Sequence, residues 1–302
     1  MKYIEEEKVK VDKNSFKIYI FNILKDLVYN GYSIEQIETM SQQLTSYIII
    51  SYLIEFGNND EIILQAINTY FNSLRICSNR CLIIADTHIG KILDFENPDD
   101  YLNPHVIYHN ELGLYNAYNY ALKNSISSII HLGDLIDGDP VHKSIICPKH
   151  QVEYLERIYP AINGIETFLL YGNHDYNAIR FDDVSDNFAK LCHNLKIIGV
   201  NYSLINFGKY PIKLSHKKSV CKSIKHVNLP YDFELAGHRH IFNIDENSRY
   251  INAPALALSL QDNSMIGFLE LINEEDRFIF KYLDQEAKQK DEKVLLKKRE
   301  LL

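Results

Sequence analysis

The chain has 302 residues, of which 46% are hydrophobic and 24% are charged, so it can build one large core and has a globular composition. A net charge of −8 and a pI near 5.8 argue against a protein that coats nucleic acid. The five cysteines are widely scattered, which fits reduced thiols better than a disulfide framework.

The N-terminus, MKYIEEEKVKVDK, is charged and lacks the apolar region of a signal peptide. The most apolar stretch, TSYIIISYLIEF, is too short to span a bilayer. These two features predict a cytoplasmic protein that is not attached to a membrane.

Residues 14–75 space their apolar side chains three and four positions apart, which predicts helices that break at Gly31 and Gly57. We therefore expect an all-helical N-terminal extension over residues 1–78. It has three interpretations: a homodimer contact, a substrate cap or a helix-turn-helix module. The segment is not strongly basic, so packing against the rest of the chain or a second copy is favoured over the nucleic-acid module.

The pattern changes after residue 79. The runs RCLIIAD, SSIIHLGD and IETFLLYGNHD are short and apolar, and each ends in polar residues, as buried central strands do. Helical stretches are expected between them, at about 105–124 and 149–162. Such alternation of strand and helix is typical of an α/β fold.

From about residue 195 the expected strands follow one another closely, as LKIIGV, YSLINFG, YPIKLSH, RYINAP, IGFLELI and RFIFKYL. Short connections predict a largely antiparallel second sheet, packed face to face with the first and with helices outside. The charged residues 284–302 are expected to form a helical tail.

Polar clusters follow the apolar runs in a fixed order: Asp86 and His88; Asp134 and Asp137; Asn173, His174 and Asp175; His216; and His238 with His240. Carboxyl ends of strands lead into loops on one edge of a sheet, so these side chains can converge. In Asp-x-His and His-x-His, an extended backbone would place both side chains on one side. Carboxylate, imidazole and amide ligands suit divalent ions such as Mn, Fe or Zn.

The ordered set D-x-H, GD-x-x-D, GNHD, an isolated strand-end His and GH-x-H resembles the calcineurin-like metallophosphoesterase superfamily. The resemblance covers roughly residues 80–283, and we expect a metallophosphoesterase domain over residues 79–283. It implies an α/β fold (α+β by some schemes) built as a four-layer αββα sandwich of two mixed sheets.

The resemblance also implies a role for each motif residue. One metal ion would be held by Asp86, His88 and His240, a second by Asn173, His216 and His238, with Asp134 bridging both. Manganese is the first choice of ion, with Fe, Zn, Ni and Co as alternatives. A metal-bound hydroxide would attack phosphorus, His174 would protonate the leaving oxygen and Asp137 would orient His174. His216 is preferred over His193 and His226 because it ends a strand-like run.

Three residues are candidates for substrate contacts. Arg239 should point away from its two histidine neighbours, Lys217 lies in a lysine-rich segment and His142 lies in the loop after GDLID. The competing interpretation of the lysine segment is a solvated loop, which we favour.

The expected function is an intracellular phosphoesterase, with a phosphodiesterase favoured over a phosphatase, acting on a small or nucleotide-like phosphoester substrate. One alternative is a metal-dependent nuclease, for which nucleic acid would be the partner and a continuous positive groove the mark. The other is a non-catalytic interaction platform on the same fold.

Overall fold

The structure is a computed structural model that describes residues 75–91, 107–138, 146–182, 194–200, 202–216, 231–259 and 264–297. The chain divides into two compact units, one of residues 1–74 and 219–230 and the other of residues 75–218 and 231–302. All described residues belong to the second unit. The helices predicted within residues 14–74 therefore lie outside the described residues.

A seven-stranded mixed sheet runs in the order β15-β14-β13-β2-β4-β5-β6. Its strands are β2 (Arg80–Ile84), β4 (Ser128–His131), β5 (Glu166–Tyr171), β6 (Leu195–Val200), β13 (Gly267–Asn273), β14 (Arg277–Asp284) and β15 (Gln289–Leu296). The four strands from β2 to β6 are parallel, whereas β13, β14 and β15 are antiparallel to their neighbours. All four residues of β4 are buried, as the apolar run predicts for a strand covered on both faces.

A six-stranded mixed sheet runs in the order β1-β7-β8-β9-β11-β10. Its strands are β1 (Arg75–Ile76), β7 (Tyr202–Phe207), β8 (Tyr210–Ser215), β9 (Phe233–Ala236), β10 (Asn243–Asp245) and β11 (Tyr250–Asn252), while β3 (Ile107–Tyr108) pairs with β12 (Leu258–Ser259). The two large sheets meet in an aromatic core, where the ring centroid of Phe233 lies 4.8 Å from that of Phe278 and 5.4 Å from that of Phe280.

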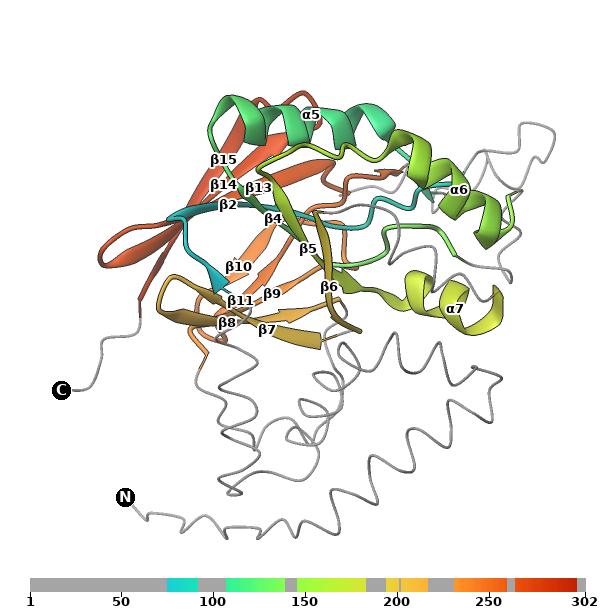
Figure 1. Cartoon of the computed structure of the whole chain (residues 1–302). Helices are drawn as coiled ribbons and strands as arrows, with labels where there is room; N and C mark the ends of the chain where they lie inside the picture. The colour runs from blue at the N-terminus through green and yellow to red at the C-terminus, as the bar shows by residue number, and fades with distance from the viewer. Residues whose placement is uncertain are drawn as a thin grey trace, which may run out of the picture. The chain divides into compact units, whose positions relative to one another are not determined.

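Three helices are described: α5 (Glu111–Lys123), α6 (Pro148–Ile158) and α7 (Asn173–Asp182). Helix α5 begins where the side chain of Asn110 accepts a hydrogen bond from the Gly113 amide at 2.9 Å. In Figure 1, α5 and α6 lie along one face of the seven-stranded sheet and the six-stranded sheet lies on the other. Among the described residues, no helix is long and apolar enough to span a membrane.

Helix α5 is tied to the sheet by a buried carboxylate on β13. Glu270 is fully buried and accepts a hydrogen bond from Arg80 Nε at 2.6 Å and another from Tyr120 Oη at 2.8 Å. Arg80 Nη1 also donates to the carbonyl of Asn124, just past the end of α5. Both oxygens of the buried carboxylate are thus satisfied, as the cost of burying a charge requires.

The α/β class and the two mixed sheets predicted from the sequence are confirmed. The prediction that the second sheet is largely antiparallel is wrong, because the pairs β1–β7, β8–β9 and β9–β11 are parallel. Of the six predicted strands, LKIIGV, IGFLELI and RFIFKYL belong to the seven-stranded sheet as β6, β13 and β14. Local periodicity identifies a strand but does not identify its partner.

The helical tail predicted for residues 284–302 is wrong where the structure describes it. Strand β15 pairs with β14 in antiparallel register, with Leu295 opposite Phe278. Leu295 is 3% exposed and Leu296 is 65% exposed, the alternation of a strand with one buried face. Similarly, Arg75–Ile76 forms β1 inside the extension predicted as helix. In both segments, pairing with an existing strand overrides local composition.

Candidate metal centre

The predicted site residues come together at the edge where the carboxyl ends of five strands meet. Strands β2, β4 and β5 of one sheet and β8 and β9 of the other end there. They lead respectively into Asp86 and His88, Asp134 and Asp137, Asn173 and His174, His216, and His238 and His240.

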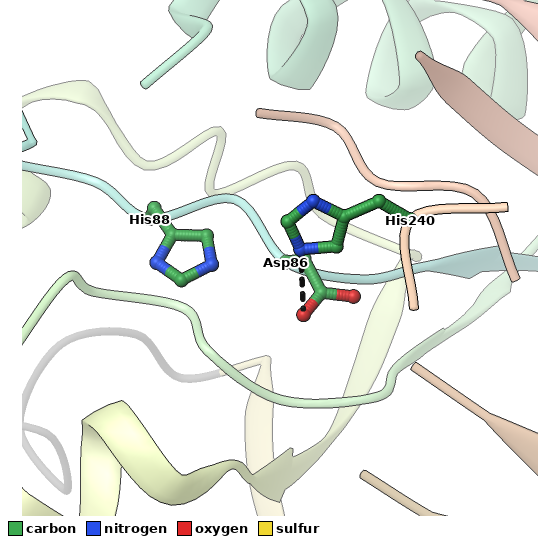
Figure 2. A group of neighbouring side chains, drawn as sticks. All are labelled: Asp86, His88 and His240. Carbon is green, nitrogen blue, oxygen red and sulfur yellow. Dashed lines mark ion pairs between the residues drawn. The ribbon is translucent and has the colours of Figure 1, made fainter. Parts of the chain in front are cut away.

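One group of candidate ligands consists of Asp86, His88 and His240. All three residues are buried, and their ligand atoms lie within 4.8 Å of one another. Figure 2 shows the imidazole of His240 beside the carboxylate of Asp86, with His240 Nε2 3.6 Å from Asp86 Oδ1. The other carboxylate oxygen of Asp86 accepts a hydrogen bond from the His238 amide at 2.8 Å, which ties the GHRH loop to the end of β2.

A second group consists of Asp134, His216 and His238, again with ligand atoms within 4.8 Å of one another. His216 Nε2 lies 2.9 Å from Asp134 Oδ2 and 3.1 Å from Asn173 Oδ1. His216 Nδ1 donates to the carbonyl of Leu132 at 2.8 Å, so in the neutral ring the Nε2 lone pair faces the carboxylate and the amide. The rival histidines, His193 and His226, lie outside the described residues.

Asp134 lies between the two groups. Its Oδ2 is 2.9 Å from His216 Nε2 and 3.8 Å from His88 Nε2, a member of the first group. Its Oδ1 accepts a hydrogen bond from the His174 amide at 2.9 Å. A single carboxylate oxygen, Oδ2, thus lies near an imidazole of each group.

The backbone that presents these ligands is left-handed rather than extended. The φ angles of Asp86, His88, Asp134, His238 and His240 are +50°, +45°, +53°, +68° and +54°. The expectation that Asp-x-His and His-x-His converge by strand alternation is therefore wrong, although the side chains do converge. The amides of Asp86 and His88 donate to the carbonyls of Gly133 and Asp134, both at 2.9 Å, which holds two of these loops together.

The glycines of the motifs are required by this close packing. A Cβ at Gly172 would collide with Oδ1 of Asp134 and lie 2.5 Å from its main-chain nitrogen. Gly133 has φ +102°, and a Cβ there would lie 2.7 Å from His216 Nδ1. The glycines therefore leave room for the ligands that follow them.

Asp137 and His174 are adjacent, but not as the sequence predicts. His174 Nδ1 donates to the main-chain carbonyl of Asp137, while the Asp137 carboxylate Oδ1 is 3.8 Å from that nitrogen. The same Oδ1 lies 3.5 Å from His88 Nδ1. The main chain of Asp137 thus orients His174, and its carboxylate is shared between the two imidazoles.

Charges in the site complement one another strongly. Burial alone would raise the pKa of Asp134, but His216, His174 and His88 hold it below its ordinary value. Burial opposes protonation of His216, yet Asp134 raises the pKa of that imidazole to about 10. Asp86 likewise raises the pKa of His240 against the effect of burial. Protons on His216 and His240 supply positive charge beside the buried carboxylates.

These residues fit a pair of divalent cations. The candidate ligand atom Asp86 Oδ1 is buried and makes no hydrogen bond, an arrangement that is costly unless another group meets this oxygen. Carboxylate, imidazole and amide oxygen together form a donor set that suits Mn, Fe or Zn.

His131 is a supporting residue that the sequence analysis missed. Its Nδ1 accepts a hydrogen bond from the Gly133 amide and its Nε2 lies 3.2 Å from Thr87 Oγ1, which donates to the carbonyl of Leu135 at 2.8 Å. Burial lowers the pKa of His131 to about 3, so this ring is neutral. It ends the strand SIIH, the same signal that identified His216.

Asp175 belongs to the GNHD motif but has a different function from its neighbours. Its two carboxylate oxygens accept hydrogen bonds from the amides of Ile136 and Gly172, at 3.0 and 2.9 Å. Burial raises its pKa to about 6. Asp175 therefore fixes the loops after β4 and β5 to each other.

Of the three candidate substrate residues, only Arg239 is described, and its side chain is exposed between the two buried or half-buried histidines. Lys217 and His142 lie outside the described residues. In the lysine-rich segment, Lys213 is buried and pairs with Glu234 at 2.9 Å, so it supports the six-stranded sheet.

The chain matches the family model of the calcineurin-like phosphoesterases over residues 79–280. It therefore belongs to the calcineurin-like phosphoesterase family. The predicted superfamily is confirmed. Comparison with the curated proteins gives no significant match.

Several solved structures resemble this chain at low identity. Yfce, a phosphoesterase from E. coli, is 12% identical, with 71% of this chain and 98% of that chain covered and a TM-score of 0.44. A dimetal phosphatase from Danio rerio is 11% identical, with 72% and 99% covered and a TM-score of 0.45. Vps29 from Entamoeba histolytica complexed with zinc is 15% identical, with 72% and 98% covered and a TM-score of 0.37. At these values the likeness assigns neither substrate nor partner to this chain.

Proposed function

We propose that the chain is a dinuclear-metal-dependent phosphodiesterase that acts on a small or nucleotide-like substrate. Asp86, His88 and His240 would hold one cation, and Asn173, His216 and His238 the other, with Asp134 between them. The position of Asp134 carries the proposal, because its carboxylate lies within 4 Å of an imidazole from each group. Manganese is the ion we favour.

Two bound divalent ions would polarise a phosphoryl oxygen and lower the pKa of a water molecule. The protein supplies the remaining functions. His174 is held through Nδ1 by the main chain of Asp137, so proton transfer to a leaving oxygen falls to Nε2. His174 is also partly exposed, with 21% of its side chain open to solvent, as contact with substrate requires. Arg239 is exposed beside the ligands, where its guanidinium can bind a phosphoryl oxygen.

The first experiment compares hydrolysis of bis-p-nitrophenyl phosphate and p-nitrophenyl phosphate by the full chain with manganese. Asp134→Asn removes the central carboxylate charge at nearly constant size, and Asp291→Asn is a matched control on the exposed strand β15. We expect manganese-dependent cleavage of the diester that Asp134→Asn abolishes and Asp291→Asn retains. Cleavage of the monoester alone would make the protein a phosphatase.

The same preparation separates the two alternatives. Faster cleavage of a single-stranded oligonucleotide than of the small diester would favour the nuclease. Metal-loaded protein that cleaves none of these substrates would contradict the proposal and favour the interaction platform.

A further inference from the structure

The carboxylate of Asp137 is surrounded by three nitrogen-bearing side chains. Its Oδ1 lies 3.5 Å from His88 Nδ1 and 3.8 Å from His174 Nδ1. Its Oδ2 is buried, makes no hydrogen bond and lies 3.7 Å from the ammonium group of Lys91. The two imidazoles and the lysine therefore attract opposite ends of one carboxylate.

The backbone places Lys91 at this position. Its amide donates to the carbonyl of His88 and its carbonyl accepts from the amide of His109, both at 3.0 Å. Gly90, the preceding residue, has φ +93°, and a Cβ there would lie 2.9 Å from Cβ of Gln151 on α6. The tight turn directs the lysine toward Asp137 rather than along the strand direction of β2.

The main chain that directly follows Asp137 is fixed by contacts with α6 and α7. Gln151 Oε1 accepts a hydrogen bond from the Gly138 amide at 2.7 Å, and Gly138 packs directly against the carbonyl of His174. Helices α6 and α7 therefore set the main-chain position next to Asp137. The freedom that remains to Asp137 is rotation of its carboxylate. The positive charge of Lys91 beside one carboxylate oxygen opposes that rotation.

We propose that Lys91 is a positioning residue that holds the Asp137 carboxylate between His88 and His174. This inference rests on the proposed function, because it assigns Lys91 an effect on the proton-donating imidazole. Without Lys91, the buried Oδ2 loses the ammonium group 3.7 Å away, and the carboxylate turns away from His174. The side chain of Lys91 is 18% exposed, so its replacement need not disturb the core.

The kinetic test compares two substrates whose leaving groups differ in basicity. Lys91→Met removes the charge, Lys91→Arg keeps it, and Lys290→Met removes a lysine that pairs with Asp284 on the exposed hairpin. Each variant is assayed on diphenyl phosphate and on bis-p-nitrophenyl phosphate. Protonation by His174 matters most for the more basic phenolate, so kcat of Lys91→Met should fall roughly tenfold to a hundredfold on diphenyl phosphate. On the nitrophenyl ester it should fall less than about threefold, with KM little changed on both.

Lys91→Arg should recover most of the lost kcat, and Lys290→Met should match the wild type. Equal losses on the two substrates, or no loss, would overturn the inference while leaving the proposed function intact. A wild-type chain that cleaves neither ester would instead contradict the proposed function.

A second readout does not depend on activity. Ring-nitrogen NMR signals of His88 and His174 should move in metal-free Lys91→Met and stay in place in Lys91→Arg and Lys290→Met. Unchanged signals in folded Lys91→Met would show that the lysine does not hold the carboxylate, whatever the protein hydrolyses.

Discussion

At the scale of single residues, the space around Asp134 leaves no room for a side chain at position 172. An added Cβ would collide with atoms of Asp134 itself, whereas at Gly237 the nearest atom, Asp86 Oδ2, is 3.1 Å away. We predict that Gly172→Ala displaces the central carboxylate and weakens manganese binding by about tenfold or more, the size of effect seen when groups that orient ligands are changed. Gly237→Ala should have a smaller effect. Titration of manganese into both variants measures this, and equal affinities would contradict it.

His131 predicts a specific pH dependence of stability. Its folded pKa of about 3 lies below the ordinary value of 6.5, so the unfolded chain binds the extra proton between these values. The contribution of His131 to stability is therefore complete above pH 6.5 and is lost as the pH falls. For metal-free protein this amounts to about 2 kcal/mol between pH 7 and pH 5.

His131→Asn removes this titration. The difference in unfolding free energy between wild type and variant should narrow by that amount from pH 7 to pH 5. Denaturant unfolding at the two values measures it, with His150→Asn on the surface of α6 as the control. Parallel pH profiles for wild type and His131→Asn would show that His131 is not held neutral.

The ligand residues could be predicted from the sequence because each polar cluster follows a strand-like run. The left-handed backbone conformation of these residues could not be predicted from the sequence. Asp86 and His88 have positive φ because their amides bond to the loop after β4, a long-range contact that no local pattern contains. Lys91 was missed for a similar reason, since only the turn at Gly90 brings it to Asp137.

At the scale of elements, β15 can be tested by paired substitutions on its two faces. Leu295 is packed opposite Phe278 and Leu296 faces solvent. We predict that Leu295→Ala costs about 2–5 kcal/mol of unfolding free energy, because it leaves a cavity between the sheets. Leu296→Ala should cost about 0.5 kcal/mol or less. Urea unfolding measures both, and two equally small effects would favour the solvated helix predicted from composition.

Element type was predictable where periodicity and burial agree. The centres of β2, β4 and β5 are apolar, α5 falls within the helical stretch predicted at about 105–124, and α6 overlaps the one predicted at about 149–162. Sheet membership was not predictable, because β13 and β14 look like members of the second sheet until the pairing of β13 with β2 and of β14 with β13 is known. The charges of β15 resemble those of a helix, but an exposed edge strand also tolerates charge.

At the scale of the whole molecule, cation binding should be coupled to unfolding. The site residues come from both sheets, so an ion that binds only the folded chain stabilises their packing together. We predict that manganese at a hundred times its dissociation constant adds about 2.7 kcal/mol to the unfolding free energy. Thermal melts of wild type and Asp134→Asn, with manganese and with EDTA, test this. A manganese shift retained in Asp134→Asn would place the binding elsewhere.

The left-handed backbone conformation of the ligand residues also affects which substitutions such a protein can accumulate in evolution. A non-glycine residue in this conformation costs about 1–2 kcal/mol, and five of the candidate ligands have it. Replacing His238 by glycine or asparagine relieves part of that cost, while it removes a ligand. Selection for stability and selection for catalysis therefore act in opposite directions at these positions. A descendant that no longer needs its metal ions would gain stability by losing the residues that bound them.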